Sequence, residues 1–577
     1  MTGLGSLLLA FLTLFTFTRL VSAQVAASEQ ADDTNQKACR LLDNIADTLA
    51  ILRTPGNRIQ VAFVVADLLW ERDEKRARSL FELVMREMAA VVASVDPSDQ
   101  NSQNNLALIT QQRRQILERI ALHDPDLASA FLQATRSVSS KNPQANRDWE
   151  DERNLQLRLA ELISVDDPVK ALRIARAALP AGVTHNFVSL LTQLQQKDPK
   201  AAQAFYRELV DRLDDENSAQ NQEMFNVGWN LVSSFQPPQA EEELHRKLVE
   251  TLIGRTLAIT PDTEHLQLAQ NLYNQTRYFM PQIEKFAPAR SARIRQWLQM
   301  VSRSFDVNSR MHNELNELSQ SGTIEDVIGL AQRYPAEFKG QIHQQAVWKA
   351  LNAGDFDRAR QLVTQLISDP GQRQQMTAQI ENQMIWKAIN ENRVGEARPL
   401  LNRVKAAEQR VQFLTQLASN LAAKGDKEGA LALLDDARLF LISVSQNSTR
   451  LSAELQLVRM YCTLAPKKSV EYLQSLILQI NQLVAAAAVL DGFEQRYLDD
   501  GEWNSHSYNT LSNLITNMDQ VLGQLALESF DEATALAGQL ERPEVRVMAQ
   551  LAIVQATLNK DEELNLNGGT NIRYSVF

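Results

Sequence analysis

A short polar segment, residues 496–509, contains the densest group of side chains that could carry out acid–base chemistry. Two carboxylates on either side of a glycosidic bond are the arrangement that hydrolyses glycans. The spacing does not match a calcium-binding EF-hand, which needs ligands at alternating loop positions. The segment therefore suggests either an active site for envelope glycan or a solvated loop between helices. Its candidate residues are Asp499, Asp500, Glu502, Trp503 and His506.

An acidic run that ends in a histidine is a second candidate. Glu241 and His245 are four positions apart, so they share one face of a helix. One carboxylate and one imidazole need further ligands from another element before they make a metal site. The run is more simply a solvated acidic face, and we expect no metal and no cofactor.

Recognised catalytic motifs are missing from the chain. It has no H-E-x-x-H, no C-x-x-C, no G-x-S-x-G and no Walker phosphate loop. We therefore expect no catalytic residues and a protein that is not an enzyme.

Arginine and aromatic residues alternate over residues 273–303 and form the best candidate for a binding surface. Both residue types are enriched at the energetic centres of protein interfaces, and they could bind an acidic or C-terminal segment of a partner. Alternatively, the apolar side chains pack inward and the arginines simply face water. The candidate binding residues are Tyr273, Arg277, Tyr278, Arg290, Arg293, Arg295 and Trp297.

An internal repeat indicates how such side chains are positioned. Residues 345–363 match residues 383–401, which begin 38 positions later, and both copies contain Trp-Lys-Ala-x-Asn. Self-similarity at an offset of this size is typical of stacked-repeat proteins. Trp348 and Trp386 occupy the same repeat position, and we interpret them as core residues rather than as a ligand platform.

Each repeat is predicted to be a hairpin of two helices. In the first copy Gly354 interrupts the helical pattern, and Asp355 is placed to cap the next helix. In the first half the turn is an Asp-Pro pair, at Asp124, Asp167 and Asp198, with proline at the first helical position. A small alanine then recurs in the second helix, where it lets two helices approach closely. These alanines are Ala77, Ala128, Ala171, Ala202, Ala359, Ala397, Ala430 and Ala533.

The turn at residues 354–359 resembles the tetratricopeptide repeat superfamily. The family's glycine and alanine fall on Gly354 and Ala359, whereas Val363 and Leu366 depart from its aromatic and small residues. Because most repeat spacings also differ, no subfamily is assigned. The resemblance implies an all-α, right-handed superhelical solenoid of antiparallel helix hairpins. It also implies a scaffold that binds protein or peptide partners on its concave face.

Residues 1–23 have the pattern of an export signal. An uncharged apolar run from Leu4 to Thr18 precedes small residues and Gln24. We therefore expect an exported protein, periplasmic or secreted, or one anchored at its N-terminus if the signal is not cleaved. After the signal no stretch is expected to span a membrane.

Breaks in the pattern suggest how the rest of the chain is divided. Adjacent prolines at 237 and 238 interrupt any helix there. We expect one helical array over residues 24–236, a second over residues 237–560, and a flexible tail over residues 561–577.

Charge and cysteine content narrow the range of partners. A formal net charge of −11 disfavours nucleic acid, which requires a basic surface. Cys39 and Cys462 lie far apart and are not expected to form a disulfide. Cys462 is interpreted as a buried free thiol. The function we expect is a noncatalytic exported scaffold for protein or peptide partners, and the alternative is a glycan-processing enzyme or accessory subunit of the cell envelope.

Overall fold

The structure, a computed structural model, describes most of the chain. The described residues are 32–95, 100–136, 145–215, 222–236, 241–261, 265–493, 497–503 and 509–559. The expected signal, the expected tail and the expected division near residue 237 all lie outside them. Those three expectations stay predictions.

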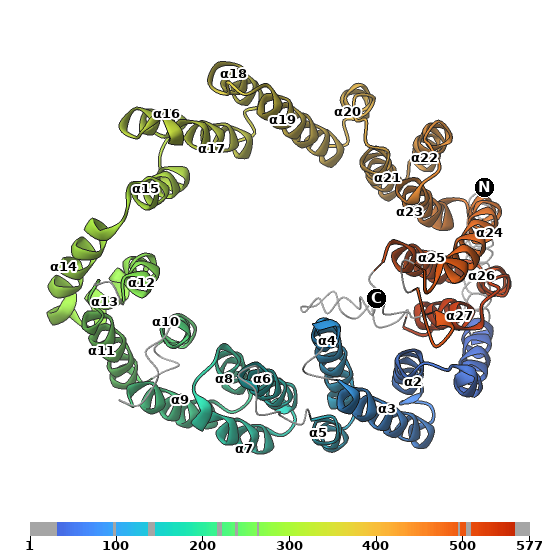
Figure 1. Ribbon diagram of the computed structural model, residues 1–577, viewed down its shortest axis with the longest axis horizontal. Coiled ribbons are helices and arrows are strands. Elements are labelled where there is room, and N and C mark those ends of the chain that lie inside the picture. Colours follow the sequence, from blue (N-terminus) through green and yellow to red (C-terminus); the bar gives the residue numbers. More distant parts are fainter. Residues whose placement is uncertain are drawn as a thin grey trace, which may run out of the picture. The chain divides into compact units, whose positions relative to one another are not determined.

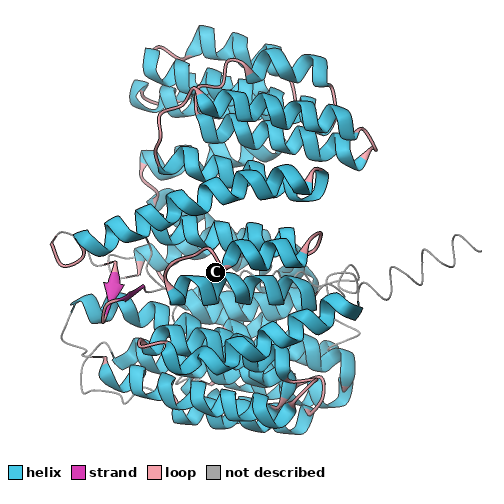
Figure 2. Cartoon of the chain, turned by 90° about the vertical axis from the view of Figure 1, so that its right-hand side faces the viewer, coloured by secondary structure: helices cyan, strands magenta, loops and turns pink. Residues whose placement is uncertain are grey.

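The described chain is almost entirely helical (Figures 1 and 2). Its one strand pair is β1 (Leu498–Asp499) and β2 (Glu502–Trp503), which are antiparallel. The predicted all-α class, built from helix hairpins, is confirmed. The handedness of a superhelix stays a prediction.

Two compact units divide the chain. Unit 1 comprises residues 1–87 and 381–577, and unit 2 comprises residues 88–380. Two helices, α3 (Glu74–Ser94) and α19 (Pro370–Asn390), cross the boundaries between them.

Unit 2 is described as a succession of helices. Its helices are α4 (Gln100–His123), α5 (Pro125–Ala134), α6 (Ala145–Ile163), α7 (Pro168–Ala178), η2 (Leu179–Ala181), α8 (His185–Lys197), α9 (Pro199–Asp214), α10 (Gln222–Ser234), α11 (Glu242–Ala258), α12 (Leu266–Tyr278), α13 (Met280–Phe286), α14 (Pro288–Ser304), α15 (Val307–Ser321), α16 (Ile324–Arg333), η3 (Ala336–Phe338), α17 (Lys339–Asn352) and α18 (Phe356–Leu366). Helices α4, α6, α8, α10 and α12 pack side by side in chain order. Each of α5, α7, α9 and α11 packs on the helix before it, which completes a hairpin.

Unit 1 repeats this arrangement. Its elements are a helix over residues 32–48, η1 (Leu49–Ile51), α2 (Pro55–Leu69), α20 (Val394–Leu401), α21 (Ala407–Ala423), α22 (Lys427–Ile442), α23 (Ser448–Leu464), α24 (Pro466–Leu490), α25 (Thr510–Ala526), α26 (Phe530–Ala537) and α27 (Pro543–Leu558). Helices α21, α23, α25 and α27 form one layer, and α22, α24 and α26 are their hairpin partners. Helix α2 packs on α27, so the early and late parts of the described chain meet within this unit.

The Asp-Pro turns are confirmed as helix starts. The carboxylates of Asp124, Asp167 and Asp198 each accept a backbone N–H of the following helix, at 2.9, 2.9 and 3.1 Å. Helices α5, α7 and α9 begin at the prolines that follow. The aspartate satisfies an N–H that the helix cannot, and proline has none to satisfy.

The two best-matched repeats have the same backbone at their turn. Gly354 has a φ of +74°, and Asn392, 38 positions later, has a φ of +56°. Asparagine is among the few residues that tolerate this left-handed conformation, so it can replace the glycine. All eight recurring alanines have no exposed area, as the close helix crossing requires. The glycine and alanine positions expected from the tetratricopeptide resemblance are thus confirmed.

Both matched tryptophans are half-buried beside the core. The Trp386 ring meets Phe413 edge-on, with centroids 5.1 Å apart. Beside Trp348, the Lys349 ammonium donates to the carbonyl of Ser319 at 2.7 Å and so caps the end of α15. These contacts support the interpretation of the repeated motif as a packing feature.

Neither cysteine forms a disulfide. Cys462 is buried, and burial raises the pKa of its thiol to about 11. The expectation of a buried, unreactive thiol is confirmed.

Removing one cap should loosen a single hairpin. The Asp355 carboxylate accepts the N–H of Arg358 at 3.0 Å, so Asp355→Ala should destabilise α18 by about 1 kcal/mol. Hydrogen exchange across residues 355–366 would show faster opening of that helix. The matched control is Asp357→Ala, because the Asp357 side chain is 92% exposed and caps nothing. Equal exchange rates in the two variants would contradict the capping role.

Candidate functional site

Helix α24 differs from every other described helix in its composition. From Tyr472 to Leu490 it has 19 residues without a single Asp, Glu, Lys or Arg. By length and composition it could cross a membrane, with a mean hydropathy of 1.6, although a third of the window is buried inside the protein. The expectation that no stretch after the signal spans a membrane therefore stays a prediction. Length and composition do not separate a span from a helix that packs against protein.

The next helix of the same layer is too short to cover α24. Helix α26 has 8 residues and α24 has 25. The turn after α26 meets α24 at Asn481, whose amide donates to the carbonyl of Gln539 at 2.9 Å. Residues 482–490 of α24 therefore extend beyond the helix that should pack beside them.

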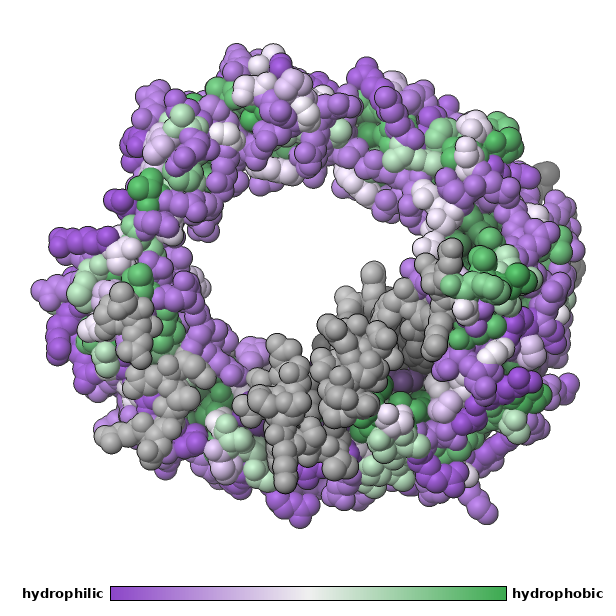
Figure 3. Space-filling view, in the orientation of Figure 1, coloured by the Kyte–Doolittle hydropathy of each residue, from purple (hydrophilic) through white to green (hydrophobic). Residues whose placement is uncertain are grey.

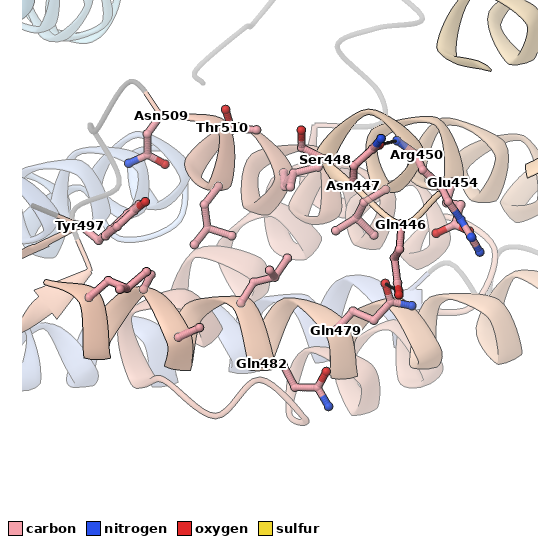
Figure 4. A pocket seen from close by; sticks show the side chains of 17 residues that line it. Gln446, Asn447, Ser448, Arg450, Glu454, Gln479, Gln482, Tyr497, Asn509 and Thr510 are labelled. Atoms are coloured by element: carbon pink, nitrogen blue, oxygen red, sulfur yellow. Dashed lines mark hydrogen bonds and ion pairs between the residues drawn. The ribbon is translucent and has the colours of Figure 1, made fainter. Parts of the chain in front are cut away.

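A groove of about 820 Å³ lies along this extension, between α24 and the first turns of α23 and α25 (Figure 4). We call it the α24 groove. Its lining residues are Gln446, Asn447, Ser448, Arg450, Leu451, Glu454, Gln479, Gln482, Leu483, Ala486, Ala487, Leu490, Tyr497, Asn509, Thr510, Leu511 and Leu514.

The floor of the α24 groove is apolar. Leu483, Ala486 and Leu490 line it from α24, one helical turn after another, and all three are exposed. Leu451 and Leu514 approach from the opposite side and are buried. Apolar side chains from three helices thus face one open space.

The rim is polar and carries no unbalanced charge. Gln446 donates to the side-chain oxygen of Gln479 at 3.0 Å across one end. At that same end Arg450 pairs with the buried Glu454 at 2.9 Å. Tyr497 and Asn509 stand at the other end (Figure 4). These two charged groups pair with each other, so the described lining of the groove carries no net charge.

Two helices begin at the groove. The side chains of Asn447 and Asn509 accept the N–H of Arg450 and Ser512, at 2.9 and 2.8 Å, and cap α23 and α25. A helix leaves four N–H groups without intrahelical partners, and one asparagine satisfies only one of them. The remaining donors at each start could bind a carbonyl or a carboxylate.

The chemistry of these side chains is that of a binding pocket. The described lining residues offer amides, hydroxyls, aliphatic groups and one Arg–Glu pair. A concave, mostly apolar site with a few oriented polar groups is the usual form of a binding pocket, and its volume is in the usual range.

The predicted Arg/aromatic residues lie on α12 and α14 of unit 2. Arg277 forms an ion pair with Glu317 at 3.0 Å, and that hydrogen bond raises the pKa of the guanidinium. The Tyr273 ring packs edge-on against Phe305, and the Tyr278 side chain is exposed. The Tyr278 ring also meets Phe279 edge-on, with centroids 5.0 Å apart, so all three residues have structural partners.

The α14 part of that segment is divided between core and surface. Trp297 is buried, and its indole N–H donates to the carbonyl of Ile259 at 2.7 Å. Arg290 donates to the carbonyl of Glu250 at 3.1 Å, and Arg295 pairs with Glu284. Arg293 is exposed. The segment as a binding surface stays a prediction, with Tyr278 and Arg293 its most accessible members.

The polar segment 496–509 contains a small strand pair that contacts both α2 and α27. The buried carboxylate of Glu502 accepts the backbone N–H groups of Arg53 and Thr54, at 2.7 and 2.6 Å. Those N–H groups immediately precede α2. Asp499 and Asp500 are exposed, and His506 lies outside the described residues.

Hydrogen bonds from the second strand complete this junction, which we call the terminal clasp (Leu498–Trp503). The Asn57 amide donates to the carbonyl of Trp503 at 2.6 Å. The N–H of Trp503 donates to the buried carboxylate of Glu544, on α27, at 2.9 Å. The clasp therefore ties the start of α2 to the start of α27. Glu502 has a structural role here, and catalysis by the segment stays a prediction.

Glu241 and His245 are turned toward different surroundings. Glu241 pairs with Arg207 at 2.8 Å on the surface, whereas His245 is buried with its ring edge-on to Phe286. Burial lowers the pKa of the His245 imidazole.

Comparisons with known proteins assign no family to the chain. No protein-family model matches it, and no curated protein matches it. Among solved structures, a circular tandem repeat protein with novel repeat topology is 16% identical, covers 93% of this chain and 100% of its own, and has a TM-score of 0.23. A homology model of the AP-3 complex is 16% identical, covers 87% and 83%, and scores 0.22. The structure of Naa15/Naa10 bound to HypK-THB is 11% identical, covers 96% and 95%, and scores 0.17. At these scores the likenesses carry no argument, and the fold described above rests on the chain's own helices.

Deleting the clasp carboxylate should separate α2 from the clasp. Glu502→Ala leaves the buried N–H of Thr54 and the partly buried N–H of Arg53 without an acceptor, and a buried unpaired donor costs about 1–3 kcal/mol. We expect a lower unfolding midpoint in denaturant and faster hydrogen exchange at residues 53–58. Glu502→Gln keeps an acceptor and should lose less, and the exposed Asp499→Ala is the matched control. An equal unfolding midpoint and equal hydrogen exchange in Glu502→Ala and Asp499→Ala would contradict a stabilising role for the clasp.

Acid should destabilise the fold through His245. Because its pKa is lowered in the folded state, the unfolded chain takes up the proton first as pH falls below the ordinary value of 6.5. Stability from this residue is therefore present above that pH and is lost below it. His245→Phe, which keeps the contact with Phe286, should show a smaller drop in melting temperature between neutral and acidic pH than the wild type. The exposed His185→Gln should follow the wild type, and an unchanged drop in His245→Phe would contradict the assignment.

Proposed function

We propose that this protein is a noncatalytic helical-repeat scaffold that binds a helical segment of a partner protein in the α24 groove. The observation that carries the proposal is an open, apolar groove between α24 and the starts of α23 and α25, with a polar rim. A repeat array buries apolar surface only between neighbouring repeats, so an uncovered groove offers a partner the contact that a missing helix would make.

The mode of binding is a helix laid into a groove. An amphipathic helix presents apolar anchors at i, i+3 or i+4 and i+7, which match the spacing of Leu483, Ala486 and Leu490. The neutral floor favours aliphatic or aromatic anchors over charged ones, because burying an unpaired charge is costly. The partner segment is therefore apolar on the face that enters the groove.

The starts of α23 and α25 set the polarity of the bound segment. Their free N–H groups carry partial positive charge, so they favour a carbonyl end or a carboxylate near Asn447 and Asn509. The last carbonyl groups of a bound helix that ends there would accept hydrogen bonds from the N–H groups at the starts of α23 and α25. This contact supplies orientation, and the floor supplies most of the affinity.

Export is part of the proposal. The apolar run of residues 1–23 supports secretion or a periplasmic location, with partners drawn from the same compartment. The exposed arginines of α14 are a second surface that could contact the same partner.

Charge placed on the groove floor should abolish peptide binding. Helical peptides selected by display against the protein would be titrated by fluorescence anisotropy. Leu483→Lys puts an ammonium on the floor and should weaken binding at least about tenfold, which is about 1.4 kcal/mol.

The matched control is Gln474→Lys, an exposed position of α24 outside the groove, which should leave affinity unchanged. Peptides that bind Leu483→Lys as tightly as the wild type, or that lose affinity equally in both variants, would contradict the groove as the binding site.

A further inference from the structure

The side of α24 that faces away from the core is also apolar. Leu478 is 57% exposed, Val489 is 73% exposed, and Phe493, just after the helix, is 85% exposed. Ala485 lies between the first two and is exposed as well. Positions 478, 485 and 489 are separated by seven and four residues, so they lie on one helical face. We call these four residues the outer stripe.

The outer stripe is separate from the α24 groove. At 100° per residue, position 489 lies about 100° around the helix from position 490, which lines the groove. None of the four residues of the outer stripe lines the groove. Gln482 lines the groove and marks the border between the groove and the outer stripe in the helical projection.

Helix α24 is therefore apolar around nearly its whole circumference. Its third face, with Leu473, Ile477 and Ile480, is buried against the protein. A helix that is hydrophobic on all sides is normally buried on all sides. The described chain covers only one of the three faces.

Neighbouring residues extend the apolar surface. Leu439 and Ile442, near the end of α22, are also exposed. Gln446, which follows α22, is bonded to Gln479 of α24, so the end of α22 lies beside the middle of α24. The space-filling view shows green, apolar atoms gathered over α22 at the upper right (Figure 3).

We propose that the outer stripe is a self-association surface, on which α24 packs against α24 of a second copy of this chain. With a net charge of −11, two copies repel each other except where their surfaces are uncharged. The charge-free run from Tyr472 to Leu490 is the longest such surface on any described helix. Interface cores are depleted of charge in the same way.

A twofold dimer also requires a surface that complements itself. The outer stripe meets this requirement, because its apolar side chains match the same apolar side chains of a second copy. Ala485, near the middle of the stripe, has a small side chain that allows two helices to approach closely.

A lipid surface fits the stripe less well. Helices that lie on membranes carry Lys and Arg on their polar face, and anionic lipids attract basic segments. The polar positions among residues 472–490 are glutamine, asparagine, serine and tyrosine, and the chain as a whole is acidic. Vesicle binding is accordingly an outcome that counts against the proposal.

Light scattering during size exclusion tests the proposal on the full chain. We expect a mass near twice 64.9 kDa for the wild type, with the monomer appearing only on dilution. The double variant Leu478→Lys/Val489→Lys should be monomeric and should retain helical circular dichroism and peptide binding. The groove variant Leu483→Lys should stay dimeric while it loses peptide binding, which separates this proposal from the scaffold function.

Three results would overturn the proposal that the outer stripe is a self-association surface. One is a monomeric wild type at every concentration. Another is a dimer that persists in the double variant. The third is wild-type binding to vesicles of phosphatidylcholine and phosphatidylglycerol that the double variant loses, which would make the stripe a membrane contact.

Discussion

Each hairpin of this chain can bury its apolar stripe only against the hairpins beside it, and the rest of the structure depends on that constraint. The recurring alanines meet it by letting neighbouring helices cross closely, and all eight have no exposed area. The same constraint explains where apolar surface remains. The last part of α24 extends beyond the short α26, and its leucines face a groove between α24 and the starts of α23 and α25.

The early and late helices of unit 1 also need a packing partner, and they obtain it in a different way. Instead of a further hairpin, the terminal clasp joins α2 to α27 through two buried carboxylates, Glu502 and Glu544. Each accepts at least one backbone N–H, which satisfies donors that would otherwise be buried without a partner. Glu502, one of the candidate catalytic carboxylates in the sequence, therefore has a structural role.

How far the sequence predicts this structure depends on the distance between interacting residues. Helix starts could be predicted because an aspartate and the N–H it caps lie three residues apart, as at Asp198. The fold class could be predicted from the internal repeat. In the second copy Asn392 occupies the position of Gly354 and has the same left-handed backbone, so the turn is preserved. The role of Glu502 could not be predicted, because its N–H donors lie 449 and 448 positions away. The groove could not be predicted, because its lining residues come from three helices and from positions up to 68 apart in the chain, although the charge-free run on α24 was a visible signal.

Hydrogen exchange with and without a saturating selected peptide tests the central claim, that α24 and the starts of α23 and α25 form the binding site. We predict slower exchange confined to residues 447–454, 479–490 and 509–514, because a bound helix covers these segments. Protection confined to residues 273–303 would place binding on the Arg/aromatic surface instead. Tight binding without protection at residues 479–490 would contradict the account.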